Sequence, residues 1–342
     1  MDVRDALRRL TAREHLSRGE TEELFGQLMD GQLSEVLKTA LLIALRTKGE
    51  QAAEIAGAAT AMRRRVVPIP HGRQEVVDTC GTGGDGRGTF NVSTAAAFVA
   101  AAGGVPVAKH GNRAVSSRSG SADVLAALGV DVEVSPRAAG QALDQLGIAF
   151  LFAPRLHPAM SAVMPVRREL GLRTVFNVLG PLTNPAGARR QVIGVYSEEL
   201  VPLLARVLAE LGCDHALVVH GSDGLDEITV TGPTLAGEVR DGEVEVYSLQ
   251  PERFGLRRAQ LRDLAGGDPE HNAGLLRRVL SGERSGPLAD ITALNAGAAL
   301  YVGNRAATLT EGVEQARALL ASGQGADMLE RLRSFRPMEE EP

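Results

Sequence analysis

The 342-residue sequence is poor in aromatic residues and in cysteine. It contains no tryptophan, and Phe, Tyr and Trp together contribute 3% of the residues. Single-stranded nucleic acids are usually bound by stacking bases on aromatic side chains, so this composition argues against that function. Only two cysteines are present, Cys80 and Cys213. A small scaffold held together by disulfides is therefore excluded, and we expect a protein of the reducing cytoplasm.

Basic charge and long hydrophobic runs are also scarce. The formal net charge is -5 and the pI is near 5.9, which opposes nucleic-acid binding through a broad basic surface. The longest apolar run, residues 95–108, is interrupted by Gly103, Gly104 and Pro106 and is too short to span a bilayer. The charged N-terminal residues do not resemble a signal peptide. We expect no nucleic-acid partner, no membrane association and a cytoplasmic location.

The hydrophobic pattern divides the chain into two parts. Residues 1–65 show apolar positions at helical spacing, with Ser34 as a good helix cap. A linker containing Pro68, Pro70 and Gly72 follows, and short apolar runs then alternate with helical segments. This alternation is typical of a mostly parallel sheet covered by helices. The expected strands are 76–80, 105–108, 130–134, 148–152, 192–196 and 215–220. The expected helices are 93–102, 122–128, 136–146, 157–170 and 199–211, with a hairpin at 238–247 that turns at Asp241-Gly242 and a mainly helical segment from Asp268 onwards.

We therefore predict an α/β protein with a small all-helical N-terminal domain and a larger α/β domain around a mostly parallel central sheet. The default ligand site of such a fold is the crevice at the carboxyl ends of the strands.

A glycine-rich loop, residues 81–86, follows the first predicted strand directly. Four glycines in six residues allow the backbone to approach a ligand closely, and the next helix begins near Asn91. The loop matches the G-x-G-x-x-G pattern of dinucleotide sites, but residues 86–122 contain no Asp or Glu to bind a ribose. The pattern favours a phosphate or diphosphate over a nicotinamide dinucleotide.

The next predicted strand leads into Lys109-His-Gly-Asn-Arg113, with serines at 116, 117, 119 and 121 behind it. Only three of the 37 basic residues are lysines, so the position of Lys109 at a strand end is notable. Cations, hydroxyls and a helix start are suitable ligands for phosphate oxygens. A solvated polar loop is the alternative interpretation.

Two further segments offer chemistry. Asp226 and Glu227 follow the predicted strand 215–220 in a glycine-containing loop, which suits Mg²⁺, although an exposed acidic turn has the same composition. Arg167 and Arg168 lie on the predicted helix 157–170, where a guanidinium can pair with a carboxylate or simply face solvent.

Four motifs together resemble the anthranilate phosphoribosyltransferase family, in the family's order and over nearly the whole chain. They are Asp78–Gly86, Phe90–Thr94, Lys109–Arg113 and Arg173–Pro185, and Leu225–Glu227 also agrees. Pyrimidine nucleoside phosphorylases share the fold, but the Lys-His-Gly-Asn-Arg run favours the anthranilate enzyme. Thr231-Gly-Pro-Thr234 follows the acids Asp226 and Glu227 at the spacing found in a common phosphoribosyltransferase loop. Because residues 221–224 separate the strand from these acids, we expect 231–234 to be structural.

The resemblance implies a nucleoside phosphorylase/phosphoribosyltransferase-like fold. Its helical domain would be residues 1–66, with roughly 157–185 packing back on it, and would form the interface of a homodimer. Residues 73–156 and 186–342 would form the α/β domain that carries the site for 5-phosphoribosyl 1-diphosphate (PRPP).

The implied activity is transfer of the phosphoribosyl group of PRPP to the amine of anthranilate, in tryptophan biosynthesis. A nucleoside phosphorylase, a nucleotide-binding oxidoreductase and a non-catalytic ligand sensor are the competing interpretations. By resemblance, the catalytic residues are Lys109, His110, Asn112 and Arg167. PRPP is assigned to Gly81, Gly84, Asp85, Thr89, Asn91, Val92, Ser93, Thr94, Lys109, Ser117 and Ser121. Anthranilate is assigned to Gly81, His110, Asn112, His157 and Arg167, and two Mg²⁺ ions to Ser93, Asp226 and Glu227.

Overall fold

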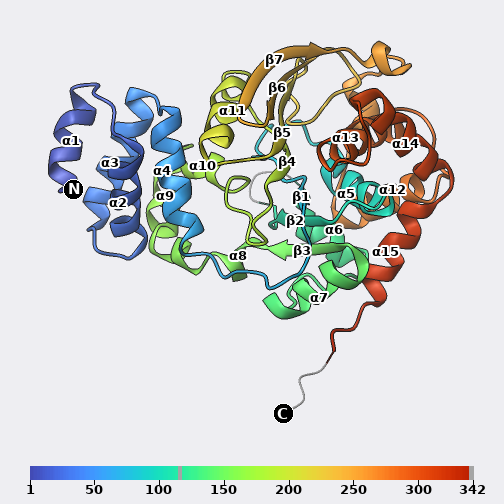
Figure 1. The fold of residues 1–342 in the computed structure, drawn as a ribbon, viewed down its shortest axis with the longest axis horizontal. Coiled ribbons are helices and arrows are strands. Elements are labelled where there is room, and N and C mark those ends of the chain that lie inside the picture. Colours follow the sequence, from blue (N-terminus) through green and yellow to red (C-terminus); the bar gives the residue numbers. More distant parts are fainter. Residues whose placement is uncertain (115–117, 339–342) are drawn as a thin grey trace.

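The computed structural model describes residues 1–114 and 118–338, which form a helical bundle beside a seven-stranded sheet (Figure 1). The strand order is β3-β2-β1-β4-β5-β6-β7. The pairs from β3 to β5 are parallel, and β6 and β7 are antiparallel. The mostly parallel sheet is therefore confirmed. The strands are β1 Val77–Asp78, β2 Val107–Gly111, β3 Ile148–Phe152, β4 Arg190–Gly194, β5 His215–Gly221, β6 Thr234–Arg240 and β7 Glu243–Leu249.

The N-terminal bundle forms because its helices are capped and share one apolar core. Ser17 and Glu20 form a capping box at the start of α2, and the Ser34 side chain caps α3. Gly57 allows α4 to approach α2 closely, because a Cβ there would lie 2.3 Å from the Arg18 carbonyl oxygen. The helices are α1 Val3–Thr11, α2 Arg18–Met29, α3 Glu35–Lys48 and α4 Ala52–Arg63. The all-helical N-terminal part is thus confirmed.

Segments from the middle of the chain pack against this bundle. The 3-10 helix η1 (Pro158–Ala162) contacts α2, α9 (Met164–Leu170) contacts α3, and α10 (Phe176–Leu179) contacts α4. The rings of Phe25 and Phe176 lie 5.6 Å apart. The hydrophobic cluster of the bundle therefore combines residues from 3–62, from 163–182 and from 193–239, and it continues to one face of the sheet.

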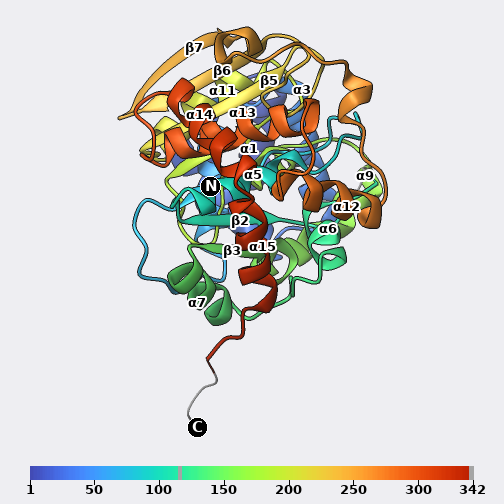
Figure 2. The same cartoon turned by 90° about the vertical axis from the view of Figure 1, so that its right-hand side faces the viewer.

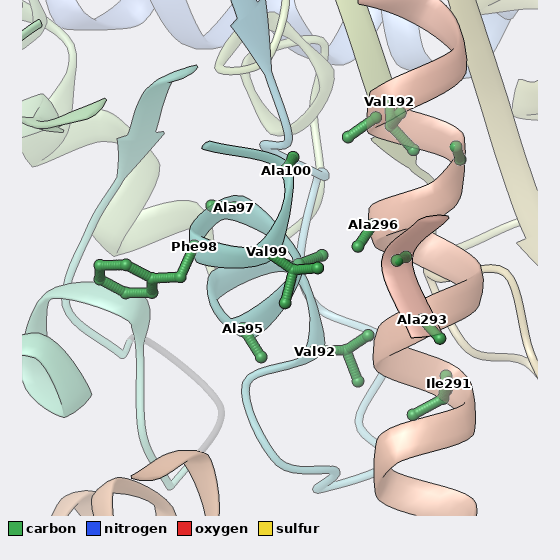
Figure 3. Close-up of a cluster of buried hydrophobic side chains, with 14 of the residues drawn as sticks. Val92, Ala95, Ala97, Phe98, Val99, Ala100, Val192, Ile291, Ala293 and Ala296 are labelled. Atoms are coloured by element: carbon green, nitrogen blue, oxygen red, sulfur yellow. The ribbon is translucent and has the colours of Figure 1, made fainter. Parts of the chain in front are cut away.

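Helix α5 (Val92–Ala102) is buried nearly throughout and packs against α13 (Pro287–Val302). Figure 3 shows Val92 and Val99 directed towards α13, from which Ile291 and Ala296 project back. Small side chains on both helices allow this close packing. The N-terminus of α5 is thereby held rigidly under the glycine loop.

The other helices cover the sheet, and Figure 2 shows α15 beside α5. They are α6 Ser121–Ala127, α7 Pro136–Leu146, α8 Ala153–Leu156, α11 Leu200–Glu210, α12 Pro269–Leu280, α14 Leu309–Ala321 and α15 Gln324–Ser334, with 3-10 helices η2 Pro251–Phe254 and η3 Leu261–Leu264. No helix within the described residues is both long enough and apolar enough to cross a membrane.

Several predictions about local structure were wrong, including the first strand, which spans Val77–Asp78 instead of 76–80, and the strand predicted at 192–196, which spans Arg190–Gly194. Residues 130–134 form no strand, although Val130 and Val132 are buried, because this segment follows α6 without pairing to the sheet. The predicted helix 157–170 is interrupted at Val163, after which a new helix, α9, begins at Met164 with Pro165 in its first turn. The second strand begins and ends later than predicted, so Lys109 and His110 lie within β2 rather than in the loop after it.

Candidate active site

The glycine loop runs from the end of β1 to the carboxyl end of β4. The Thr82 N–H donates a hydrogen bond to the Gly194 carbonyl at 2.8 Å. A Cβ on Gly81 would lie 2.9 Å from that carbonyl oxygen and 3.3 Å from Oδ2 of Asp226. A Cβ on Gly194 would lie only 1.5 Å from the Asp226 carbonyl oxygen. These close approaches require glycine and bring the acidic loop after β5 against the glycine loop.

Lys109 connects three segments that are distant in the sequence. Its side chain is buried, and Nζ donates to the Thr79 carbonyl and to Ser93 Oγ, each at 3.3 Å. Ser93 is in the first turn of α5, and its N–H donates to Glu227 Oε1 at 3.2 Å. A cation, a helix start and a carboxylate therefore meet at one point of the sheet edge.

The carboxylates of Asp85, Asp226 and Glu227 form an acidic group beside this point. Burial raises the pKa of Asp226, and repulsion from Asp85 raises it further. Burial and the charge of Asp226 raise the pKa of Glu227 well above its usual value, although Lys109 opposes the shift. Buried carboxylates that repel one another are stabilised by a divalent cation with oxygen ligands. The residues predicted to bind metal are therefore chemically suited to Mg²⁺.

Asn91 and Thr94 flank Ser93 at the start of α5. Nδ2 of Asn91 donates to the Ser119 carbonyl at 3.2 Å, and its Oδ1 accepts from Asn272 at 2.9 Å. The Thr94 hydroxyl is buried and has no hydrogen-bond partner within the described residues.

The other residues predicted to bind PRPP, apart from Val92, lie outside the first turn of α5. Thr89 pairs with Ala265 in an isolated bridge, Gly84 has a positive φ of 81° in the exposed loop, and Ser121 opens α6. Val92 contributes no polar side chain, since it packs into the core (Figure 3). Its N–H donates to the Phe90 carbonyl at 2.8 Å. Ser117 lies outside the described residues.

The two predicted acceptor-site histidines form a buried pair. Their Nε2 atoms are 3.1 Å apart, and Nδ1 of His110 lies 3.3 Å from the Gly180 carbonyl oxygen. Burial lowers the pKa of His110 to about 3 and that of His157 to about 4, so both rings are neutral near pH 7. Asn112 follows at the exposed end of β2, where its Oδ1 accepts from the Arg113 N–H at 2.7 Å.

Arg167 lies on α9, at the bundle side of the molecule. Its guanidinium carbon is 5.6 Å from the centre of the Phe176 ring, and burial lowers its pKa. Within the described residues it has no carboxylate partner and no hydrogen bond to either histidine. Arg168, the neighbouring candidate, is exposed. Arg167 is therefore the desolvated guanidinium of the two, and a bound carboxylate would satisfy it.

The structure also adds residues to which the sequence analysis gave no role. Asp78 is fully buried and accepts hydrogen bonds from the His110 N–H and from Asn184. Arg173 donates to the Gly84 carbonyl and stacks on Tyr196, 3.9 Å from the ring centre. A carboxylate at the end of an apolar strand was a visible signal for Asp78, but no spacing pattern indicates the contacts of Asn184 or Arg173.

The loop after the acidic residues is held by its own side chains. Oδ2 of Asp223 accepts from the hydroxyls of Thr229 at 2.7 Å and Thr231 at 2.6 Å, and Thr234 Oγ1 accepts from the Thr229 N–H at 3.0 Å. These threonines are thus occupied within the protein, as a structural role for 231–234 requires.

Comparison with known proteins gives consistent matches over most of the chain. Residues 4–66 match the helical bundle domain of the glycosyl transferase family, and residues 73–326 match its a/b domain. An anthranilate phosphoribosyltransferase of an Anaeromyxobacter species is 56% identical over 330 residues, covering 96% of this chain and 97% of the relative. The crystal structure of the Thermus thermophilus enzyme of that name superposes with a TM-score of 0.92 at 52% identity, covering 96% and 98% of the two chains. The Saccharomyces cerevisiae enzyme in complex with PRPP and Mg has a TM-score of 0.86 at 30% identity, with 96% of each chain covered.

Proposed function

The chain belongs to the anthranilate phosphoribosyltransferase family, and on that premise we propose how its residues carry out the reaction. The enzyme transfers the phosphoribosyl group of PRPP to the amine of anthranilate, which gives N-(5-phosphoribosyl)anthranilate and diphosphate in tryptophan biosynthesis. The observation that carries the proposal is the meeting of Lys109, Ser93 and Glu227 beneath the glycine loop, at 3.3 and 3.2 Å.

On the donor side, we propose that the glycine loop and the first turn of α5 hold the phosphates of PRPP. By resemblance, this proposal assigns Gly81, Gly84, Asp85, Thr89, Asn91, Val92, Ser93, Thr94 and Ser121 to PRPP, although the Val92 N–H already donates to the Phe90 carbonyl. Ser117 belongs to the same proposal by resemblance. Backbone N–H groups in a glycine loop and at a helix start are suited to anions. Lys109 would neutralise negative charge that grows on the departing diphosphate.

We propose that Asp226 and Glu227, with Ser93, hold Mg²⁺, with two ions in the loaded site. When bound, the metal would offset charge on the diphosphate and orient it. The raised pKa values of both carboxyl groups support this assignment, because a cation relieves their repulsion. The yeast relative in complex with PRPP and Mg supports the use of Mg²⁺ by this family.

On the acceptor side, we propose that Arg167 pairs with the carboxylate of anthranilate and that Asn112 aims its amine at the ribose. Gly81, His110 and His157 would line the same pocket. An aromatic amine is almost unprotonated at pH 7, so attack requires no strong base. The reaction then depends on leaving-group stabilisation and on holding the two substrates in line, both of which preorganised residues supply.

We further propose a cytoplasmic homodimer built through the helical domain, residues 1–66 with 157–185. Both cysteines are free, as in reducing compartments. The side chain of Val36 on α3 is 77% exposed, beside a cavity of about 1020 Å³ between α1, α3 and α9. A second copy of the chain would cover this apolar surface. The α/β domain, residues 73–156 and 186–342, would keep its PRPP site away from the interface.

The fluorescence of anthranilate provides a direct test of the reaction. The purified protein is mixed with anthranilate, PRPP and Mg²⁺, and a fall in fluorescence that requires all three supports the proposal. A folded protein that causes no change, but cleaves pyrimidine nucleosides in the presence of phosphate, would contradict it.

A further inference from the structure

Strand β1 ends at Asp78, where the chain turns into the glycine loop, while its neighbour β2 continues. The main chain of β2 therefore lacks a strand partner on that side, and side chains take its place. Oδ1 of Asp78 accepts from the His110 N–H at 3.1 Å. Nδ2 of Asn184 donates to the Ala108 carbonyl at 2.8 Å. Both groups that β1 leaves unpaired are thus bonded by side chains.

Asp78 and Asn184 also bind each other. Nδ2 of Asn184 donates to Oδ2 of Asp78 at 2.7 Å, and Oδ1 of Asn184 accepts from the Ala186 N–H at 2.8 Å. The side chains are 0% and 7% exposed. Each polar side-chain atom of the pair therefore has a partner, and a fully bonded buried network of this kind is rigid.

The two β2 groups held by this pair lie on either side of Lys109. The Lys109 side chain reaches Thr79 and Ser93. Its Nζ lies 3.3 Å from both the Thr79 carbonyl oxygen and Ser93 Oγ. A small shift of the β2 backbone would therefore move Nζ of Lys109 away from the proposed PRPP site. The same shift would move the His110 ring, which faces His157 in the acceptor pocket.

We propose that Asp78 and Asn184 are positioning residues, which together direct Lys109 towards PRPP and His110 towards the acceptor pocket. The inference rests on the proposed function, because it gives Lys109 and His110 roles in the two substrate sites. Both residues are buried, so neither needs to contact a substrate. Their effect is transmitted through the β2 backbone.

The substitution Asp78→Asn tests the pair with little change in volume. The two oxygens of Asp78 face two donors, so an amide nitrogen at this position must face one of them. Rotating the Asn184 amide only moves the conflict to the Ala186 N–H. We expect kcat to fall by about 10- to 100-fold and the affinity for PRPP to fall with it, since small misplacements of reacting groups have effects of this size.

The exchange variant Asp78→Asn with Asn184→Asp provides the matched rescue. The amide at position 78 can then donate to the carboxyl group at position 184, which still accepts from Ala186. Burial favours the protonated form of the new carboxyl group at position 184, whose O–H then donates to the Ala108 carbonyl in place of the lost amide. We expect the exchange variant to be several-fold more active than Asp78→Asn alone. Equal or lower activity would overturn the inference, because it would show that the pairing itself is unimportant.

Tyr247→Phe is the control for loss of a buried hydrogen bond to a carboxylate. Tyr247 donates to Glu238 at 2.6 Å on the far side of the sheet, in β7. The Tyr247→Phe substitution should lower thermal stability and leave kcat and both KM values unchanged. If Asp78→Asn behaves like this control, the pair is merely structural. If Asp78→Asn fails to fold, Asn184→Ser carries the test by the same criteria, because it leaves both oxygens of Asp78 in place.

Calorimetric titration with PRPP and Mg²⁺ separates this inference from the proposed function. An unsubstituted protein that binds PRPP but does not consume anthranilate would contradict the proposed function alone. The PRPP affinities of the three pair variants would still decide the inference. Affinities equal to that of the unsubstituted protein, together with unchanged turnover where turnover occurs, would overturn it.

Discussion

The hydrogen bond between the side chains of His110 and His157 fixes which ring nitrogen of each carries the hydrogen. Because the Gly180 carbonyl can only accept, Nδ1 of His110 must carry the hydrogen, and its Nε2 is then an acceptor. Nε2 of His157, 3.1 Å away, must therefore donate. This assignment leaves Nδ1 of His157 as a buried acceptor without a partner in the described part of the chain. Of the four ring nitrogens, this buried one is the one left to accept a further hydrogen bond in the described part of the chain.

The pair predicts a specific loss of stability in acid. The pKa of His157 is about 4 in the folded protein and near 6.5 in the unfolded chain, so only the unfolded chain gains a proton between these values. Stability from this group is complete above pH 6.5 and declines as pH falls towards 4. Between pH 7.5 and pH 5, we expect the free energy of unfolding to fall by about 2 kcal/mol more for the unsubstituted protein than for His157→Gln, as measured by urea unfolding. His15→Gln, at an exposed histidine, is the control, and parallel pH profiles for the unsubstituted protein and His157→Gln would contradict the prediction.

Arg167 should determine the affinity for anthranilate. Arg167→Ala removes a desolvated guanidinium, and a hydrogen bond to a charged group contributes about 1.5–3 kcal/mol, so the anthranilate KM should rise about 10- to 100-fold. The PRPP KM should change much less. Arg167→Lys keeps the charge but loses the bidentate geometry, so its anthranilate KM should lie between those of the unsubstituted protein and Arg167→Ala. Steady-state kinetics with each substrate varied in turn measure the effects on the two KM values separately, and Arg168→Ala is the control. Equal effects on both KM values would assign the carboxylate to another residue.

The acidic group should make stability depend on Mg²⁺. Asp226→Asn combined with Glu227→Gln removes mutual repulsion, so this double variant should be at least as stable as the unsubstituted protein without metal. It should gain no thermal stability from Mg²⁺ with PRPP, because ligands stabilise only the state that binds them. Turnover should fall by about 100-fold or more.

Asp223→Asn is the matched control for that experiment. Asp223 lies in the same loop but bonds Thr229 and Thr231 instead of facing the other carboxylates. Its loss should lower stability and leave the thermal gain from Mg²⁺ intact. A thermal gain that survives in the Asp226/Glu227 double variant would show that the metal is held elsewhere.

The exposed face of α3 should form the homodimer interface. Val36→Glu places a charge in the apolar surface beside the cavity between α1, α3 and α9, and burying an unpaired charge is unfavourable. Light scattering at micromolar concentration should change from twice 36.0 kDa to 36.0 kDa. Val246→Glu is the control, because Val246 is also exposed but lies on β7. A monomeric unsubstituted protein, or a Val36→Glu variant that remains dimeric, would contradict the prediction.

Features that depend on neighbouring residues were predicted best from the sequence. The hairpin turn at Asp241-Gly242 is an example: both residues have positive φ, 52° and 86°, as a tight two-residue hairpin requires. Helix α7 and strand β3 have the predicted bounds, since Ser135 and Gly147 cap the helix on either side. The alternating Val130, Val132 and Val134 have the pattern of a strand but form none, because a strand also needs a partner and the sheet ends at β3.

The sequence by itself determined the class of the fold and the chemistry available, because periodicity, caps and glycines act over a few residues. It also placed Lys109, Arg167 and the acids Asp226 and Glu227 in segments suited to anions, carboxylates and metal. Only the tertiary structure decided which of these groups meet. Ser93 and Glu227 are separated by 134 positions, and they touch because the order of the parallel strands brings the ends of β1, β2, β4 and β5 to one edge. The pair of Asp78 and Asn184, 106 positions apart, likewise exists because β1 ends before β2 and leaves backbone groups that only a distant segment can reach.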